Sequence, residues 1–188
     1  MSLTVLTAST AAPITLAELR SHVRGSTEDN ALITSYALSA RHYCETFTRT
    51  AVAPTQYRLT QPCLGDVTLP RSPVLSSTSY TTTVSYLVQG ASTWTTVASS
   101  LYRVEAGTPG RVVLKSGASW PSPTFETGDP VRIDFWAGTT AAPEPIKQAM
   151  RLLVGHWYEN RESVVVGTVQ AKLAHTVSML LWSERVDV

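Results

Sequence analysis

The fold class is decided by the stretch Val131-Arg132-Ile133-Asp134-Phe135, in which apolar and polar residues alternate. Gln56-Tyr57-Arg58-Leu59 alternates in the same way. Because successive side chains of a strand point to opposite faces, this alternation predicts strands with one buried face and one solvent-exposed face. Between these stretches, the residues from Ser72 to Tyr102 carry no charge and are rich in Ser, Thr, Val and Tyr, a composition typical of strands. We therefore expect a β region over about residues 55–140.

Turn signals separate the expected strands. Gln89-Gly90-Ala91-Ser92 is placed to turn a hairpin, and Gly107-Thr108-Pro109-Gly110 leads into the apolar strand Arg111-Val112-Val113-Leu114. Strands that follow one another so closely, with turns between them, favour antiparallel pairing over parallel β-α-β units.

The chain before the β region predicts helices over about residues 15–50. Thr15 and Glu18 have the spacing of a capping box, which marks the start of the first helix. Ile14 and Leu19 are placed as the hydrophobic staple that accompanies such a box.

The first helix is expected to end at Gly25, and Ser26 or Thr27 to cap a second helix. Pro54 prevents the second helix from continuing. Its apolar face consists of residues at three- and four-residue steps: Leu32, Ile33, Tyr36, Ala40, Tyr43, Cys44 and Phe47.

The chain after the β region predicts a helix over about residues 144–162, with Pro145 in its first turn. The tail that follows, residues 163–188, is expected to be mobile and to contain a short helix from about His175 to Trp182. One face of this short helix carries the residues that we expect to dock on a partner: Val177, Leu180, Leu181 and Trp182. The alternative is that this cluster folds back on the helical bundle of its own subunit.

Together these patterns predict an α+β fold: a small helical bundle built from the N- and C-terminal helices, with an antiparallel β-sheet region inserted between them. A length of 188 residues suits a single domain over residues 1–188. Apolar residues make up 43% and charged residues 15%, well below the usual charged share of about 25%. So sparse a charge indicates that other chains cover part of the surface.

The net charge is +1, so the chain lacks the basic surplus of a protein that holds DNA through its phosphates. The apolar stretch from Ser163 to Ser183 comes nearest to membrane length, but Lys172 and several polar residues argue against a transmembrane helix. Cys44 and Cys63 form no metal motif and are expected to be free thiols.

Standard catalytic signatures are missing: the sequence holds no Walker-type phosphate loop, no G-x-G-x-x-G, no H-E-x-x-H and no G-x-S-x-G. His156 and Glu159 lie on one helix face, as in some bundle metal sites, but matching acids on other helices are lacking. A capping or interface hydrogen bond is the better interpretation of this pair. The tryptophans leave a sugar-stacking face on the Ser/Thr-rich sheet as an alternative.

Several segments, in a fixed order along the chain, carry a family resemblance. The most specific is the helix that begins at Pro143-Glu144-Pro145-Ile146 and contains His156, Trp157, Tyr158, Glu159, Asn160 and Arg161. It resembles the signature helix of tailed-phage head–tail connector proteins, also called head-completion adaptors, which have relatives in prophages and gene transfer agents. Ala40-Arg41-His42-Tyr43-Cys44-Glu45 resembles the second helix of this family.

Further segments resemble markers of the subgroup of connectors that has an inserted β region. They include Leu69-Pro70-Arg71-Ser72-Pro73-Val74, Ser119-Trp120-Pro121 and Phe135-Trp136-Ala137-Gly138. The chain departs from the family at Thr139-Thr140, where many relatives have an aromatic residue. The resemblance runs from about Ile14 to Trp182, which is nearly the whole chain.

The resemblance implies a structural protein that forms a ring, typically of twelve copies, beneath the portal protein. Such a ring extends a channel through which DNA passes without sequence-specific binding. It also docks the next neck or tail protein, a stopper or a tail terminator. The implied location is the virion neck, after assembly in the host cytoplasm and without membrane contact.

We therefore expect no enzymatic activity, no catalytic residues, no cofactor and no metal. Two alternatives from other classes of protein stay open: a β-sheet binding module that is directed at a receptor or a glycan and forms no ring, and a small enzyme of an unrecognised type.

Overall fold

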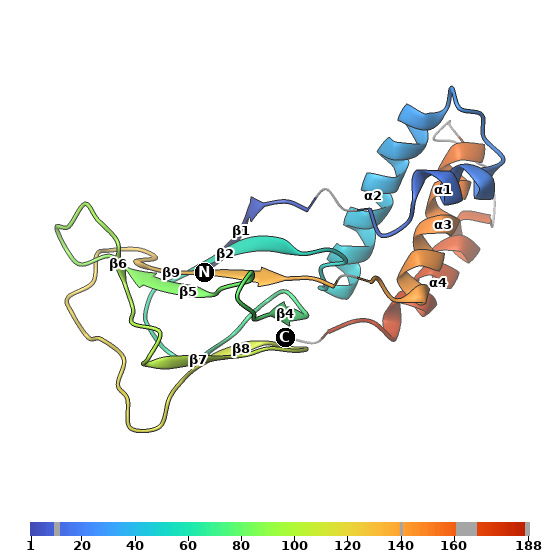
Figure 1. Ribbon diagram of the computed structural model, residues 1–188. Coiled ribbons are helices and arrows are strands. Elements are labelled where there is room, and N and C mark those ends of the chain that lie inside the picture. The colour runs from blue at the N-terminus through green and yellow to red at the C-terminus, as the bar shows by residue number, and fades with distance from the viewer. Residues whose placement is uncertain (10–11, 140, 161–168, 187–188) are drawn as a thin grey trace. The chain divides into compact units, whose positions relative to one another are not determined.

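The computed structural model describes residues 1–9, 12–139, 141–160 and 169–186, with only the backbone of 169–172. Within these ranges it contains helices and antiparallel sheets, which confirms the expected α+β fold (Figure 1).

The chain forms two compact units. We call the first the β unit, and it comprises Met1–Thr10, Ala53–Thr139 and Val186–Val188. We call the second the helical unit, and it comprises Ala11–Val52 and Thr140–Arg185. The β region is therefore inserted between helices, as predicted, but it also recruits the N-terminal segment of the chain.

The helical unit contains α1 (Leu16–Val23), α2 (Asn30–Thr48), α3 (Glu144–Glu159) and α4 (Val169–Trp182). In the described ranges, none of these helices combines the length and the apolar composition that a membrane span requires. Apolar side chains of all four helices form its core, among them Leu19, Ile33, Met150 and Leu181, which are at most 1% exposed.

The capping box at the start of α1 is confirmed. The Thr15 backbone N–H donates to Glu18 Oε2 (2.9 Å), and the Glu18 N–H donates to Thr15 Oγ1 (3.2 Å). Ile14 and Leu19 are both buried, as the staple requires. The helix ends one residue earlier than expected, because Arg24 and not Gly25 takes the left-handed conformation (φ 53°).

The start of α2 corrects the prediction. The helix begins at Asn30 and not after Ser26 or Thr27, and its N-cap, Asp29, makes no side-chain cap bond. The Asp29 carboxylate is used differently. Its Oδ2 accepts from the Ser26 N–H (3.0 Å) and from the Tyr158 hydroxyl of α3 (2.8 Å). The bond from Ser26 closes the turn that precedes α2, and the bond from Tyr158 ties this turn to α3.

The larger sheet of the β unit has the strand order β1-β2-β9-β5-β6, with β4 also paired to β9. All of these pairs are antiparallel. The strands are β1 (Ser2–Thr7), β2 (Thr55–Gln61), β4 (Val74–Leu75), β5 (Thr83–Tyr86), β6 (Thr95–Thr96) and β9 (Val131–Ala137).

The alternation that predicted β2 and β9 is confirmed, because buried and half-buried side chains alternate along both strands. On the buried face, Phe135 is 0% exposed and its ring stacks on Tyr57 with 5.7 Å between centroids. On the other face, the Arg58 guanidinium makes two hydrogen bonds of 2.7 Å to the Asp134 carboxylate. This pair raises the pKa of Arg58.

A smaller sheet has the order β3-β8-β7 and consists of β3 (Val67–Thr68), β7 (Tyr102–Glu105) and β8 (Arg111–Leu114). In Figure 1, β7 and β8 form a second layer beside the larger sheet. β8 coincides with the predicted strand. The predicted turn at Gln89–Ser92 joins β5 to β6, and Gly90 takes a positive φ of 74° in it.

β1 is a strand that the sequence did not predict. It pairs with β2 from Ser2 opposite Thr60 to Thr7 opposite Gln56, with a bulge between Val5 and Thr7. The segment became a strand because a partner far along the chain offers its edge, and no local signal reports such a partner.

Candidate interaction surfaces

The last helix is longer than expected, and it divides the expected docking residues into two groups. α4 begins at Val169 and not near His175. Val177 and Leu181 are 0% exposed in the core of the helical unit, and Leu180 packs against that core. This part of the tail, which was expected to be mobile, is therefore packed on its own unit, and these side chains anchor the helix.

The outer side of α4 is the part that remains available to a partner. Trp182 is 66% exposed, and Met179, which the sequence analysis did not single out, is 65% exposed. The Arg185 guanidinium lies 5.3 Å from the centre of the Trp182 ring. The segment Ser163–Thr168, at the start of the expected tail, lies outside the described residues.

The family-signature residues of α3 mostly hold the helical unit together. The Asn160 side-chain amide donates to the His156 carbonyl oxygen (3.0 Å) and lies 3.2 Å from His156 Nδ1. Asn160 is therefore the residue that caps the end of α3, and His156 accepts this cap through its carbonyl oxygen. Glu159 is exposed, and Arg161 lies outside the described residues.

The two aromatic residues of the signature connect α3 to α2. Tyr158 donates to Asp29, as described above, and the Trp157 ring packs at 6.1 Å from Tyr36. The signature therefore joins helices that are distant in sequence. In the described ranges, no group of three or more His, Cys, Asp or Glu side chains is arranged to hold a metal ion.

The two cysteines differ in their surroundings. Cys44 is 0% exposed in the core of the helical unit, and its burial raises the pKa of the thiol to about 12. Cys63 is exposed, and both thiols are free. Because the thiolate is the reactive form, Cys44 is doubly protected from thiol reagents.

We expect one thiol of the native protein to react with Ellman's reagent at mildly alkaline pH, and two thiols after denaturation. The Cys63→Ser variant should show no reaction while folded. Rapid labelling of Cys44 in that folded variant would contradict the buried position of this residue.

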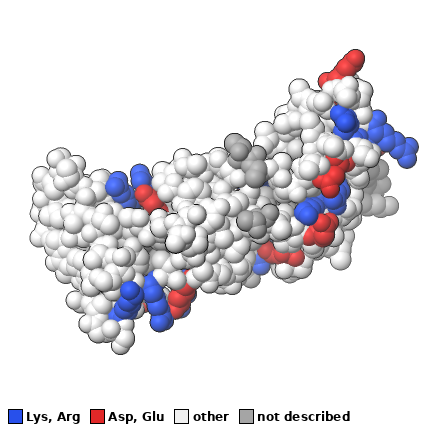
Figure 2. Space-filling view, in the orientation of Figure 1, with Lys and Arg blue, Asp and Glu red and all other residues white. Residues whose placement is uncertain are grey.

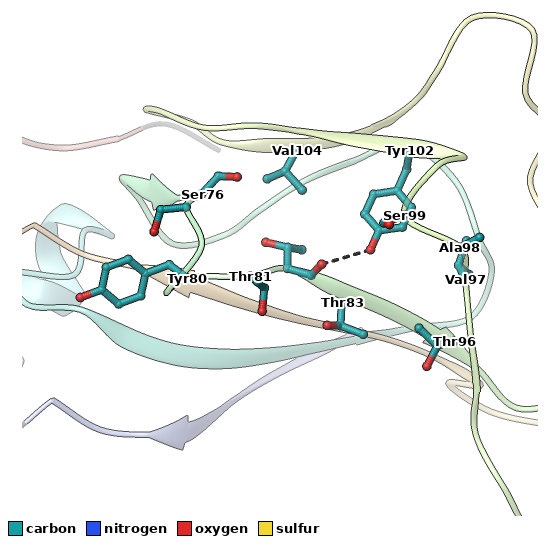
Figure 3. Close-up of a pocket in the computed structure, with 12 residues that line it drawn as sticks. Ser76, Tyr80, Thr81, Thr83, Thr96, Val97, Ala98, Ser99, Tyr102 and Val104 are labelled. Atoms are coloured by element: carbon teal, nitrogen blue, oxygen red, sulfur yellow. Dashed lines mark hydrogen bonds between the residues drawn. The ribbon is translucent and has the colours of Figure 1, made fainter.

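A hollow of about 540 Å³ lies in the β unit, and most of its lining side chains carry hydroxyl groups (Figure 3). The hydroxyl of Tyr102, on β7, donates to the Thr82 carbonyl oxygen at 3.1 Å. Burial raises the pKa of Tyr102. The lining residues are Ser76, Ser77, Tyr80, Thr81, Thr82, Thr83, Thr96, Val97, Ala98, Ser99, Tyr102 and Val104.

The side chains that line this hollow can form hydrogen bonds with an uncharged polar ligand. Its lining residues include no carboxylate, imidazole, amine or thiol that could exchange protons with a substrate near neutral pH. Sequence reasoning did not identify the hollow. The one available signal was the uncharged, hydroxyl-rich stretch Ser72–Tyr102, which contributes every lining residue except Val104.

Charged side chains are few on the β unit. On the face that Figure 2 shows, they gather in small groups and leave wide uncharged areas between them. Arg132 illustrates how the unit shields its charges, because its guanidinium lies 4.3 Å from the centre of the Trp94 ring. Burial lowers the pKa of Arg132.

No protein-family model and no curated protein matches the sequence. Solved structures do match. A chain in the neck of an empty GTA particle, computed with C6 symmetry, superposes with a TM-score of 0.79 at 28% identity. A chain in the virion of a native gene transfer agent (GTA) particle gives 0.75 at 29% identity, and one in the neck of a native GTA particle, computed with C12 symmetry, gives 0.76 at 28%.

Each match covers 100% of this chain and 97% of the other chain. Both units, and not the sheet alone, are therefore similar to these proteins. The likeness supports the resemblance to phage-like neck proteins that the segment order indicated. The chain is therefore a structural protein of a virion neck and not an enzyme.

Proposed function

We propose that the chain is a head–tail connector subunit. Copies of it form a ring beneath the portal protein, extend the DNA channel and dock the next neck or tail protein. The observation that carries the proposal is the match over the full length of the chain to proteins of a GTA neck. The C6 and C12 symmetries of those structures are consistent with a ring, and with twelve copies in it.

The charge of the chain suits this role. A net charge of +1 is far from the basic surplus that retains DNA through its phosphates. A channel built from such subunits lets DNA slide through it without sequence-specific binding.

The test uses heads that carry the portal protein but lack this chain. Added purified protein should attach to the portal vertex, and electron microscopy should show a new ring there. Heads without portal protein are the control and should gain no density. A protein that fails to attach to portal-bearing heads would refute the connector role.

We propose further that the outer side of α4 contacts the portal protein. Trp182 is the residue expected to carry most of this contact, because exposed tryptophans that become buried are frequent anchors of interfaces. Met179 lies on the same helix with a similar exposed fraction, and its flexible side chain adapts to an irregular partner surface.

Trp182→Ala should separate docking from folding. Because the side chain is 66% exposed, the free energy of unfolding should change by no more than about 0.5 kcal/mol. Attachment to portal-bearing heads should fall at least about tenfold, since truncated interface anchors cost about 2 kcal/mol or more. Attachment is measured by counting bound copies per head at a series of protein concentrations.

Two variants serve as controls for Trp182→Ala. Leu38→Ala removes a side chain of α2 that is 62% exposed and should affect neither folding nor attachment. Leu181→Ala removes a side chain that is 0% exposed and should lower the free energy of unfolding by about 2–5 kcal/mol. If Trp182→Ala attaches like the wild type, α4 does not form the docking surface.

The ring-free binding module is a second candidate, and the hydroxyl-lined hollow is the observation that favours it. Such a module would bind an uncharged polar ligand, such as a glycan, without assembling on a portal vertex. Saturable binding of an oligosaccharide, together with no attachment to portal-bearing heads, would favour the module over the connector.

A further inference from the structure

The larger sheet ends at β1, and the outer edge of this strand is open in the described residues. Natural edge strands are usually protected by charged residues, by proline or by shortness. β1 is six residues long and its sequence SLTVLT lacks charge and proline, so its protection is limited to the bulge between Val5 and Thr7. The edge strand β7 of the smaller sheet, in contrast, carries Arg103 and Glu105, which pair at 2.8 Å.

The side chains of β1 also extend an apolar row whose outer end, on β1, is exposed in the described residues. Val5 lies opposite Tyr57, which lies opposite Phe135, so the three share one face of the sheet. Tyr57 and Phe135 are 5% and 0% exposed, but Val5 is 55% exposed. Leu6, at the bulge, is 40% exposed. An apolar partner would complete this row.

The opposite end of the same sheet is β6, which is only two residues long and offers a short second edge without charge. Thr95 and Thr96 are exposed, β-branched and part of the uncharged stretch Ser72–Tyr102. Both open ends of the larger sheet are therefore uncharged, while the smaller sheet has a charged outer strand.

We propose that neighbouring copies of this chain join edge to edge, β1 of one copy beside β6 of the next. The proposal rests on the connector role, since it names the surfaces by which copies would form the ring. A ring requires two different patches that meet head to tail, and opposite ends of one sheet supply such a pair. The contact covers Val5 and pairs backbone groups of β1 that are otherwise left open.

The direction of the strands makes this contact specific. Four successive antiparallel pairings lead from β1 through β2, β9 and β5 to β6, so β1 and β6 run in the same direction. Neighbouring copies in a ring are related by a small rotation, so β1 of one copy and β6 of the next would pair in parallel. Pairing of β1 with a second β1 would instead be two-fold and would stop at a dimer.

A charge placed on either edge should prevent the ring without unfolding the subunit. Val5→Lys and Thr96→Lys should each reduce the number of copies bound per portal-bearing head at least tenfold. Circular dichroism and the melting temperature should remain those of the wild type, since both positions are exposed. Leu38→Lys, an equally radical change on α2, should bind normally.

These outcomes distinguish the edge contact from the connector role. If the wild type attaches to portal-bearing heads and Val5→Lys attaches equally well, the edge contact is wrong and the connector role stands. If the wild type itself does not attach, the connector role fails. An equal loss with Leu38→Lys would overturn the assignment to the sheet edges.

Cysteine cross-linking tests the pairing directly. In a Cys63→Ser background, Thr4→Cys or Val5→Cys is combined with Thr95→Cys or Thr96→Cys, and the proteins are oxidised after attachment to heads. At least one of the four combinations should give a ladder of covalent multimers, while Val5→Cys alone stays monomeric. A dimer from Val5→Cys alone, or no multimers from any combination, would overturn the proposal.

Discussion

Phe135→Ala is expected to lower the free energy of unfolding of the protein by about 3–5 kcal/mol, a typical cost of removing a buried ring. Phe135 is 0% exposed, lies at the centre of the larger sheet and stacks on Tyr57 at 5.7 Å. Its loss leaves a cavity on the buried face of the larger sheet, whose strands are fixed by hydrogen bonds, so the surroundings collapse only partly. Urea denaturation followed by circular dichroism measures the effect.

The next residue of the same strand is the control. Trp136 lies on the opposite face of β9, is half-buried and contacts the Tyr80 ring at 5.3 Å. Trp136→Ala should therefore cost clearly less than Phe135→Ala, although it removes a larger side chain. Equal losses at both positions would contradict the assignment of Phe135 to the buried face.

Gly138→Ala is expected to destabilise the β unit by about 1–3 kcal/mol or more, because two penalties act at one position. Gly138 has a φ of 142°, which residues with a Cβ rarely adopt. An added Cβ would also collide with the backbone carbonyl of Ala53, which leads into β2. The Gly138 N–H donates to the Pro73 carbonyl oxygen at 2.8 Å, so the backbone is not free to move away.

A second glycine serves as a control with backbone strain but no collision. Gly117 also has a positive φ, of 79°, but an added Cβ would meet no atom within 4 Å. Gly117→Ala therefore measures a backbone strain without a collision, and the larger loss expected for Gly138→Ala reflects the collision together with a φ that lies further from the left-handed region. Thermal denaturation should show the larger loss for Gly138→Ala. Equal losses would mean that the Ala53 carbonyl gives way to the added methyl group.

The Ala-Gly pair that resembled a subgroup marker thus has a physical reason. The end of β9 passes so close to the backbone before β2 that no side chain fits between them. A resemblance pointed to this position, but only the structure shows what the glycine is needed for.

The sequence by itself determined those elements whose signals are local. The capping box of Thr15 and Glu18 acts within one turn, so its residues suffice to place the start of α1. The alternation in β2 and β9 reports burial directly, because one face of each strand lies in the core. The α+β class and the place of the β insertion follow from these signals.

Only the tertiary structure decided the elements that depend on distant partners. The turn that precedes α2 is tied to α3 by the hydrogen bond from Tyr158 to Asp29. The division of the α4 residues between core and surface depended on how the helix packs, because Leu181 and Trp182 are adjacent in sequence and equally apolar. β1 exists because β2 offers an edge to it. Contacts between segments far apart in the chain determine these features, and the periodicity of one segment carries no information about its partner.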